Sequence, residues 1–167
     1  MTHVSIGGVR LTGREILGAI AAAVLINLIG ALGVPFTTPD SAWFQALEKP
    51  WFYPPGAAFG IVWTVLFTLM GLAAFLIYRR GFENRAVKLA LGVFALQMVV
   101  NVAWSPAFFA AQELLLALGI IVALWVLIVA TIVAFSRVDR RAAALLVPYL
   151  AWVSFAAVLN YSIWALN

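Results

Sequence analysis

The sequence predicts an all-α integral membrane protein, a bundle of five transmembrane helices. Of its 167 residues, 66% are hydrophobic and 10% are charged, whereas a soluble domain has about 45–50% apolar and about 25% charged residues. The charges also leave five stretches of 23 to 29 residues free of Asp, Glu, Lys and Arg. A helix needs about 20 residues to cross about 30 Å of hydrocarbon, so each stretch is long enough. The five stretches are Ile16–Pro39, Pro50–Tyr78, Leu89–Gln112, Leu114–Ser136 and Ala142–Asn167.

This composition argues against several other classes of protein. A membrane β-barrel would show segments of about ten residues that alternate apolar and polar side chains, but these stretches are apolar on every side. The net charge of +4 is spread thinly along the chain and is not gathered into a basic patch, so no nucleic-acid partner is expected. The absence of cysteine excludes disulfides and thiolate metal sites.

We expect one membrane domain over residues 1–167, with transmembrane helices at 15–33, 57–78, 86–109, 113–135 and 141–164. Arg10 and Arg14 precede the first apolar run as in a secretory signal, but that run exceeds the roughly 7–15 residues of a signal's apolar region. The last three connections are short, which requires neighbouring helices to pack antiparallel. The exception is the connection over residues 34–56.

The distribution of basic residues predicts the orientation. Nine of the ten Lys and Arg residues lie before the first helix or in the connections after the second and fourth helices. Lys49, in the long loop, is the tenth. Because cytoplasmic loops carry the excess of Lys and Arg, we expect a cytoplasmic N-terminus, with the long loop and the C-terminus on the opposite side. This bias fits a bacterial cell membrane better than an outer membrane.

The predicted membrane interior contains no Asp, Glu, Lys, Arg or His. It therefore lacks the titrating group that proton-coupled transport uses and the nucleophile–base pair of a hydrolase. It also lacks a histidine to hold haem iron, since the only histidine is His3 in the N-terminal segment. No metal site and no obligatory cofactor are expected. We interpret Glu113, at the predicted start of the fourth helix, as a cap that suits the helix dipole.

Polar and aromatic residues recur at helical spacing on two of the predicted helices. The face on the third helix consists of Gln97, Asn101, Trp104, Ser105 and Phe108. The face on the fifth helix consists of Tyr149, Trp152, Ala156 and Asn160. Amides in hydrocarbon need partners, so these faces point into the bundle. They act either as glue between helices or as polar anchors in a ligand pocket.

Seven tryptophans are present, and three of them, Trp63, Trp104 and Trp152, fall within helices toward the side of the long loop. They are either belt and core residues or the lining of one cavity. Pro106 and Pro148 each remove a helical hydrogen bond and are expected to kink their helices, which opens space for a cavity.

The long loop is proline-braced and aromatic. Asp40 or Ser41 can cap a short helix that runs to about Glu48. Loops of this length are usually functional, so the segment is either a lid over the bundle or an interfacial helix among lipid headgroups.

Five motifs in order resemble the TspO/translocator protein family, also called tryptophan-rich sensory proteins or peripheral-type benzodiazepine receptors (TspO/MBR). The motifs are WFQALEKPWFYPP at 43–55, GIVWTVLF at 60–67, ALQMVVNVAWSPAFF at 95–109, VPYLAWVSF at 147–155 and LNY at 159–161. The resemblance implies a five-helix bundle, often a homodimer, whose pocket beneath the first loop binds porphyrins and related tetrapyrroles, sterols or isoquinoline-type compounds.

The polar faces and the resemblance together give the candidate ligand-binding residues. They are Trp43, Trp51, Phe52, Trp63, Gln97, Asn101, Trp104, Ala107, Tyr149, Trp152, Phe155, Ala156 and Leu159. Some members of the family degrade protoporphyrin IX photochemically. The resemblance implies that Trp63 and Trp152 would be the catalytic pair if this chain does so.

Two positions depart from the family pattern. The loop motif K-P-x-W-x-P-P has Phe52 at the tryptophan position, with Trp51 beside it. The family's proposed sterol motif needs Lys or Arg after L-N-Y, but Ser162 follows here, which argues against a sterol ligand. Without an intramembrane His, stacking and amide contacts would hold protoporphyrin IX or haem equally well, with either Lys49 or backbone donors of the loop near the propionates.

Three functions follow as hypotheses. The first is a membrane sensor, receptor or carrier for tetrapyrroles, and the second is a light-dependent porphyrin-degrading enzyme. The third is a scaffold or accessory subunit that docks other helices through small residues such as Gly18, Ala22, Ala86 and Ala90.

Overall fold

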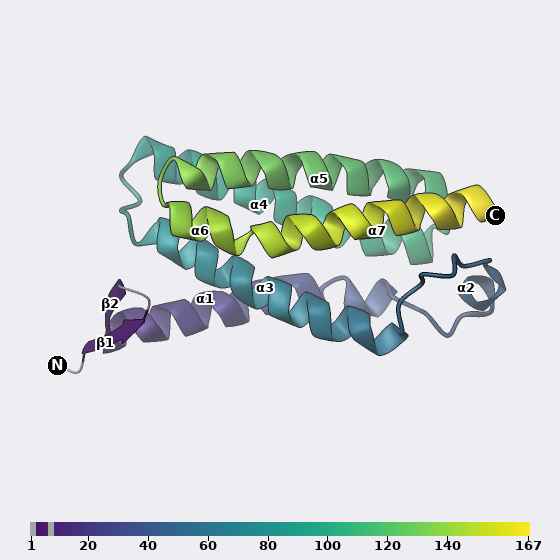
Figure 1. Ribbon diagram of the computed structural model, residues 1–167, viewed down its shortest axis with the longest axis horizontal. Helices are drawn as coiled ribbons and strands as arrows, with labels where there is room; N and C mark the ends of the chain where they lie inside the picture. The colour runs from purple at the N-terminus through teal and green to yellow at the C-terminus, as the bar shows by residue number, and fades with distance from the viewer. Residues whose placement is uncertain (1–2, 7–8) are drawn as a thin grey trace.

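The computed structural model describes residues 3–6 and 9–167. Within these residues, five helical spans are long and apolar enough to cross a membrane, which confirms the predicted helical membrane bundle. The spans are Gly13–Phe36, Gly56–Tyr78, Arg85–Ala110, Leu114–Ser136 and Arg140–Leu166. The helices run lengthwise through the molecule, and the two ends of the chain lie at opposite ends of the bundle (Figure 1).

Two short strands precede the bundle and were not predicted. Strand β1 (His3–Ile6) pairs antiparallel with β2 (Val9–Thr12). Helix α1 (Gly13–Ala31) begins directly after β2. Its start is a capping box, in which the Thr12 side chain accepts from the Glu15 N–H and the Glu15 carboxylate accepts from the Thr12 N–H. Reciprocal capping of this kind fixes where a helix begins.

The remaining elements lie close to their predicted bounds. The 3-10 turn η1 (Val34–Phe36) and helix α2 (Ala42–Ala46) lie in the long loop. They are followed by α3 (Gly56–Tyr78), α4 (Arg85–Ser105), η2 (Pro106–Ala110), α5 (Leu114–Ser136), α6 (Arg140–Leu145) and α7 (Val147–Leu166). Glu113 occupies the N-cap position of α5, but its side chain makes no capping hydrogen bond. The N-cap position is the predicted one, and there the carboxylate suits the helix dipole without a hydrogen bond.

Both prolines interrupt their helices, as predicted. Pro106 begins η2, a wider π-helical turn in which the Ala111 N–H donates to the Pro106 carbonyl over 2.8 Å. Near Pro148, the predicted helix at 141–164 is divided into α6 and α7, which meet at Leu146. Proline has no N–H to donate into the ladder, and the backbone changes direction instead.

Helix α1 packs mainly on α3, side by side with it in Figure 1. A Cβ on Gly71 would lie 2.5 Å from the Ala23 Cα, so the two backbones are in direct contact. Gly18 on α1 receives the Phe75 ring in the same way. Close approach of small residues is the usual way that membrane helices pack. Because Gly18 and the fully buried Ala90 are used inside the chain, they are not available as docking faces for another protein.

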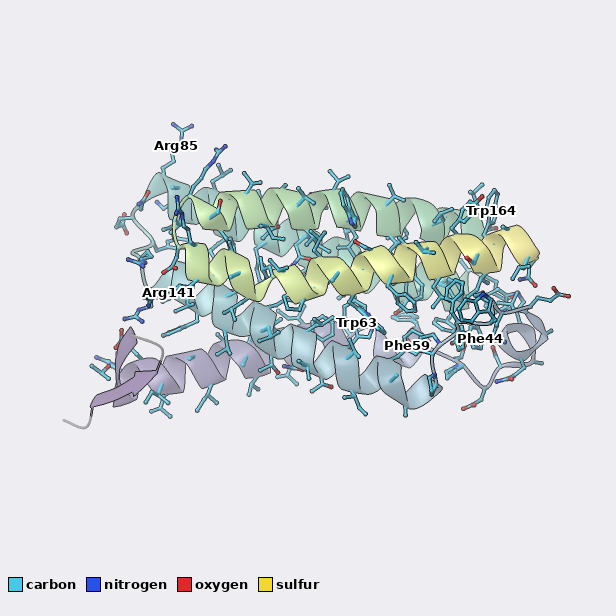
Figure 2. All side chains as sticks on the ribbon, viewed as in Figure 1. Phe44, Phe59, Trp63, Arg85, Arg141 and Trp164 are labelled. Atoms are coloured by element: carbon cyan, nitrogen blue, oxygen red, sulfur yellow. The ribbon has the colours of Figure 1, made fainter. Side chains whose placement is uncertain are left out.

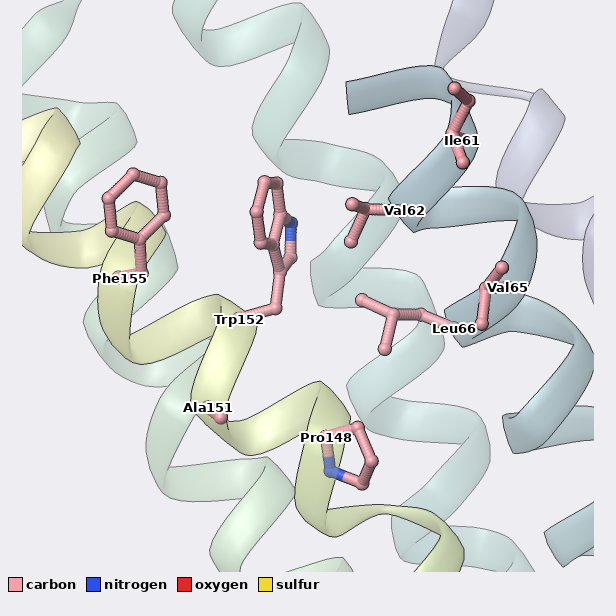
Figure 3. A pocket seen from close by; sticks show the side chains of 8 residues that line it. All are labelled: Ile61, Val62, Val65, Leu66, Pro148, Ala151, Trp152 and Phe155. Atoms are coloured by element: carbon pink, nitrogen blue, oxygen red, sulfur yellow. The ribbon is translucent and has the colours of Figure 1, made fainter. Parts of the chain in front are cut away.

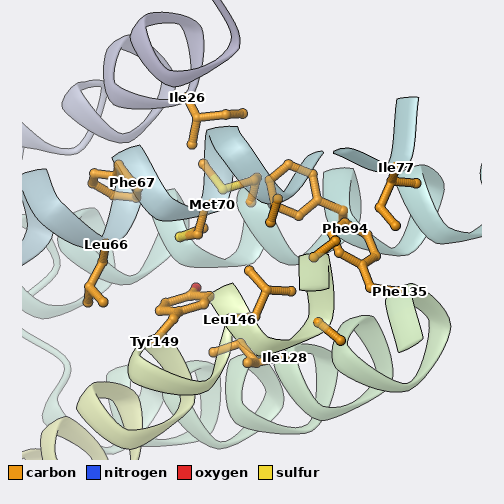
Figure 4. Close-up of a cluster of buried hydrophobic side chains, with 14 of the residues drawn as sticks. Ile26, Leu66, Phe67, Met70, Ile77, Phe94, Ile128, Phe135, Leu146 and Tyr149 are labelled. Carbon is orange, nitrogen blue, oxygen red and sulfur yellow. The ribbon is translucent and has the colours of Figure 1, made fainter. Parts of the chain in front are cut away.

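The main core lies between α3, α4, α5, α6 and α7 (Figure 4). Met70, Phe94, Phe135, Leu146 and Tyr149 meet there, each at most 5% exposed. Helix α3 packs along α6, but its contacts with α7 are sparse. The two helices therefore diverge beyond the break at Leu146.

At the end of the bundle near the N-terminal strands, two ion pairs join the connections. The Arg79 guanidinium lies 2.6 Å from the Glu15 carboxylate, and that of Arg80 lies 2.5 Å from the Asp139 carboxylate. Burial alone would raise the pKa of Asp139, but hydrogen bonds from Arg80 and from the Arg141 backbone outweigh burial and lower that pKa below its ordinary value. Arg85 and Arg141 lie at this end in Figure 2, and Phe44 and Trp164 lie at the other.

Candidate ligand-binding site

The long loop covers the end of the bundle where α7 finishes (Figure 1). The Ser41 hydroxyl caps α2 by accepting from the Phe44 N–H over 3.3 Å, which selects between the two predicted caps. Helix α2 ends at Ala46 and not at about Glu48 as predicted, because Leu47 adopts an extended backbone. The short helix directs Phe44, which is 5% exposed, into the bundle.

Aromatic rings from the loop and from η2 form one cluster, which we call the loop-side cluster. The Phe44 ring lies 6.3 Å from that of Phe108 and 5.3 Å from that of Phe109, and Trp43 meets Phe108 edge to face at 5.9 Å. Its buried members are Phe44, Ala107, Phe108, Phe109, Ala117, Leu159 and Ile163. These contacts support the prediction that the loop is a lid packed onto the bundle.

Polar contacts fasten this lid. The Lys49 ammonium donates to the Phe44 carbonyl over 2.8 Å and to the Leu47 carbonyl over 3.1 Å, and it also lies 4.6 Å from the centre of the Phe44 ring. The Asn167 side chain, after α7, accepts from the Glu48 N–H and donates to the Glu48 carbonyl. The Lys49 ammonium therefore holds the loop itself together, and its contact with ligand propionates stays a prediction.

A second row of rings runs from the loop to α7. Phe52 packs on Phe155 at 6.2 Å, and Phe59 packs on Trp152 at 5.8 Å. Tyr53 contacts Phe59, and its burial raises the pKa of the Tyr53 hydroxyl. Phe52, at the family's tryptophan position, therefore contacts α7, whereas the neighbouring Trp51 is 96% exposed.

Buried amides join α4 to α7. Asn101 donates through Nδ2 to the Tyr149 hydroxyl over 2.8 Å, and that hydroxyl donates to Gln97 Oε1 over 2.9 Å. This series of hydrogen bonds matches the interpretation that the polar faces hold the helices together. However, Gln97 is 1% exposed, and its Nε2 has no hydrogen-bond partner. One amide donor in this polar chain is therefore left available.

The tryptophans on the helices differ in how their indole N–H groups are used. Trp104 stacks on Phe108 at 4.8 Å and donates to Asn160 Oδ1 over 2.9 Å. Trp63 stacks on Phe67 at 5.2 Å and meets Tyr149 edge-on. Trp152 Nε1 is buried and has no acceptor.

The remaining candidates lie around these rings. Ala156 is half-buried against the main core, and Leu159 and Ala107 are buried in the loop-side cluster. The predicted residues are therefore brought together in two adjoining groups, and the exposed Trp51 contacts only the outer side of one of them, through Phe52 at 5.6 Å. Sequence reasoning missed Phe59 as a site residue. Its helical spacing from Trp63 and Phe67 was a usable signal.

An apolar groove of about 520 Å³ lies between α3 and α7 (Figure 3). Eight residues line it: Ile61, Val62, Val65, Leu66, Pro148, Ala151, Trp152 and Phe155. The Trp152 ring stands between the two helices, with its nitrogen on the edge that faces Val62 (Figure 3). The groove follows from the divergence of α3 and α7.

The site is suited to binding by shape and stacking. In the part of the chain that the structure describes, no three His, Cys, Asp or Glu side chains gather as ligands for a metal ion. Rings stack on flat apolar molecules, and Gln97 Nε2 and Trp152 Nε1 are two buried donors without acceptors in this part of the bundle. This is a mostly apolar site with a few orienting polar groups, which is typical of small-molecule sites.

Comparison with known proteins agrees with this architecture. The model of the TspO/MBR family matches residues 20–165. The chain is 41% identical over 155 residues to the tryptophan-rich protein TspO of Chlorobaculum tepidum, covering 92% of this chain and 98% of that protein. It is 35% identical over 150 residues to the tryptophan-rich sensory protein of Cereibacter sphaeroides, covering 87% and 92%.

A mammalian relative is almost as similar. The chain is 36% identical over 152 residues to the translocator protein of Bos taurus, covering 89% of each. Five apolar spans, a lid on one end of the bundle and a family match over most of the chain agree with one another. This integral membrane protein belongs to the TspO/MBR family.

Proposed function

We propose that this protein is a membrane receptor or sensor that binds porphyrins and related tetrapyrroles beneath its loop. The observation that carries the proposal is the pair of buried donors, Gln97 Nε2 and Trp152 Nε1, which lack acceptors beside an aromatic site. Buried polar groups without partners are rare in native proteins, and each one calls for an explanation. A flat ligand with acceptor atoms at its edge supplies one.

The names of the relatives support the general role. One relative is called a tryptophan-rich sensory protein, and others are called translocator proteins. The first name favours signalling, and the second favours carriage of a ligand. Binding of a small apolar molecule is common to both.

The ligand would be held without a bond to a metal. Stacking on rings such as Phe155 and Trp152, together with edge contacts to Gln97, does not depend on iron. We therefore expect protoporphyrin IX and haem to bind with similar affinity, as ligands and not as obligatory cofactors.

A titration tests the proposal. Protoporphyrin IX added to the purified protein in detergent should quench tryptophan fluorescence saturably. Ala156→Phe places a ring among the candidate residues and should weaken binding about tenfold or more, because overpacking a filled site forces its neighbours to shift. The matched control is Ala130→Phe on the exposed side of α5, which should bind like the natural sequence. Non-saturable quenching, equal in both variants, would refute the proposal.

We propose that the N-terminus and the ion-paired end face the cytoplasm, with the lid on the opposite side of a bacterial cell membrane. The proposal rests on the nine basic residues that lie before or in the first turn of α1 or in the segments that follow the second and fourth spans. Reporter fusions at each terminus test it, and a cytoplasmic C-terminus would contradict it. Light scattering in detergent tests the homodimer that the family resemblance implies.

Light-driven porphyrin breakdown is the second candidate. It is favoured because Trp152 and Trp63 are both half-buried and both contact rings of the site. An illuminated porphyrin could accept an electron from an indole, with dioxygen as the terminal oxidant. Porphyrin absorbance should then decay under light and oxygen, and Trp152→Phe should slow the decay. Decay as fast in the variant, or in micelles without protein, would refute this function.

A further inference from the structure

The groove between α3 and α7 opens toward the lipid-facing side of the bundle. Two residues on its rim are largely exposed, Ile61 at 68% and Val65 at 53%. Both lie on α3 within a membrane span, so the rim contacts hydrocarbon. All eight lining residues are apolar apart from the indole N–H of Trp152. The groove is thus open to the bilayer and closed to ions.

The other approach to the site is covered. Phe44 of the loop is buried against the bundle. The Lys49 ammonium bonds to two carbonyls of the loop, and the Asn167 side chain bonds to the Glu48 backbone. A molecule coming from the aqueous side would first have to displace this lid. A molecule dissolved in the bilayer meets no such cover at the groove.

Two rings, those of Trp152 and Phe155, lie between the groove and the site beneath the loop. Trp152 lines the groove and also packs on Phe59 at 5.8 Å and on Phe155 at 5.4 Å. Phe155 in turn contacts Phe52 of the loop. The groove and the covered site therefore share a wall, which Trp152 and Phe155 form.

The shared wall carries an unused donor. Trp152 Nε1 is buried without an acceptor and lies on the ring edge that faces Val62 across the groove (Figure 3). The indole N–H of Trp104 is already bonded to Asn160, whereas that of Trp152 has no acceptor. In hydrocarbon there is no water to satisfy such a donor.

We infer that the ligand enters laterally from the bilayer through the α3–α7 groove, and that the Trp152 N–H is its first polar contact. The inference rests on the proposed function and adds its route. It also defines the ligand class, a flat and predominantly apolar molecule that partitions into the membrane and carries an oxygen or nitrogen acceptor. The groove volume of about 520 Å³ lies within the range of small-molecule sites, about 300–1,000 Å³.

The test measures how fast protoporphyrin IX, carried in donor vesicles of phosphatidylcholine, reaches the full-length protein in acceptor vesicles. Transfer is followed by quenching of tryptophan fluorescence after mixing. Ala151→Leu narrows the groove, and Ala130→Leu makes the same change on the exposed side of α5. A substitution that only narrows the entry route slows ligand binding and ligand release by the same factor and leaves the dissociation constant unchanged. We therefore expect A151L to slow both rates about tenfold and A130L to match the natural sequence.

A lid variant separates the two routes. Asn167→Ala removes the tie between α7 and the loop, and it should leave transfer from vesicles unchanged. Equal rates in A151L and A130L, or faster transfer in N167A, would overturn the lateral route while leaving the proposed function intact. If the natural sequence binds no protoporphyrin saturably, the proposed function fails, and the lateral route fails with it.

Discussion

Trp104 donates its indole hydrogen to Asn160 Oδ1 over 2.9 Å and thereby joins α4 to α7 in the membrane interior. Asn160, 2% exposed, also donates through Nδ2 to the Leu114 carbonyl at the start of α5. One amide therefore holds three helices in register below the lid. By contrast, the indole N–H of Trp152, on the same helix as Asn160, is buried and has no acceptor.

Asn160→Leu should destabilise the protein by about 1–3 kcal/mol, because it leaves the Trp104 N–H without a partner in a buried setting. Thermal unfolding in detergent measures the effect. Ser162→Ala is the control, since the Ser162 hydroxyl bonds only to its own helix at Val158. Equal melting temperatures for N160L and S162A would show that the amide does not hold the helices together.

Gly71→Ala should displace α1. The new Cβ would lie 2.5 Å from the Ala23 Cα and 2.7 Å from the Ala22 carbonyl oxygen, and backbone atoms cannot rotate out of the way. Overpacking of this kind costs about 1–3 kcal/mol. Gly119→Ala is the matched control, because nothing lies within 4 Å of its added Cβ. It should leave stability unchanged or raise it by up to about 1 kcal/mol, as measured by thermal unfolding.

Much of this architecture could be predicted from the sequence, because hydrocarbon permits few solutions. Charge-free stretches long enough to span it, such as Leu114–Ser136, must be helices, since every backbone group needs a partner. The kinks at Pro106 and Pro148 follow from the missing N–H. Helical spacing likewise placed Gln97, Asn101 and Trp104 on one inward face.

Other features depend on contacts between distant residues that periodicity cannot supply. The pairing of Asn167 with Glu48 joins residues far apart in the chain, and the sequence does not indicate that Lys49 bonds to the Phe44 and Leu47 carbonyls. The divergence of α3 from α7 depends on the direction that α7 takes after the break that follows α6. Whether an indole such as that of Trp152 finds an acceptor depends on the same packing.

The free energy of unfolding should decrease at acidic pH because Asp139 becomes protonated. Its pKa is lowered in the folded protein, whereas an unfolded Asp titrates near about 3.9. The unfolded state therefore binds the proton more readily, and the contribution of Asp139 is complete above about pH 5 and lost as the pH falls through the folded pKa. Asp139→Asn should flatten this part of the melting profile and lower stability at pH 7. Glu83→Gln, exposed at the same end, controls for the loss of one carboxylate, and matching profiles in the two variants would contradict the prediction.

Asn167→Ala should loosen the lid without unfolding the bundle. It removes both hydrogen bonds to Glu48, so amides in residues 41–53 should exchange with deuterium several-fold faster, whereas those of α5 should be unchanged. Gln45→Ala is the control, since Gln45 bonds only within the loop, to the Pro39 carbonyl. Mass spectrometry of peptide fragments measures the difference. Uniform exchange in both variants would mean that Asn167 does not fasten the loop.

Trp152→Phe should separate the effect of the indole N–H on ligand binding from the effect of the aromatic ring. Phenylalanine keeps an aromatic wall between the groove and the covered site, but it removes the unpartnered N–H. If that N–H bonds to the ligand, its loss costs about 1–1.5 kcal/mol, which corresponds to an affinity about tenfold weaker. Binding is best followed by the absorbance shift of protoporphyrin IX, because the substitution itself removes a fluorophore.

Trp125→Phe is the matched control, since Trp125 Nε1 already donates to Ser154 over 2.8 Å and its ring faces lipid, 39% exposed. W125F should bind with unchanged affinity even though it loses a hydrogen bond. Equal affinity in W152F and W125F would show that the free N–H of Trp152 is not used in binding.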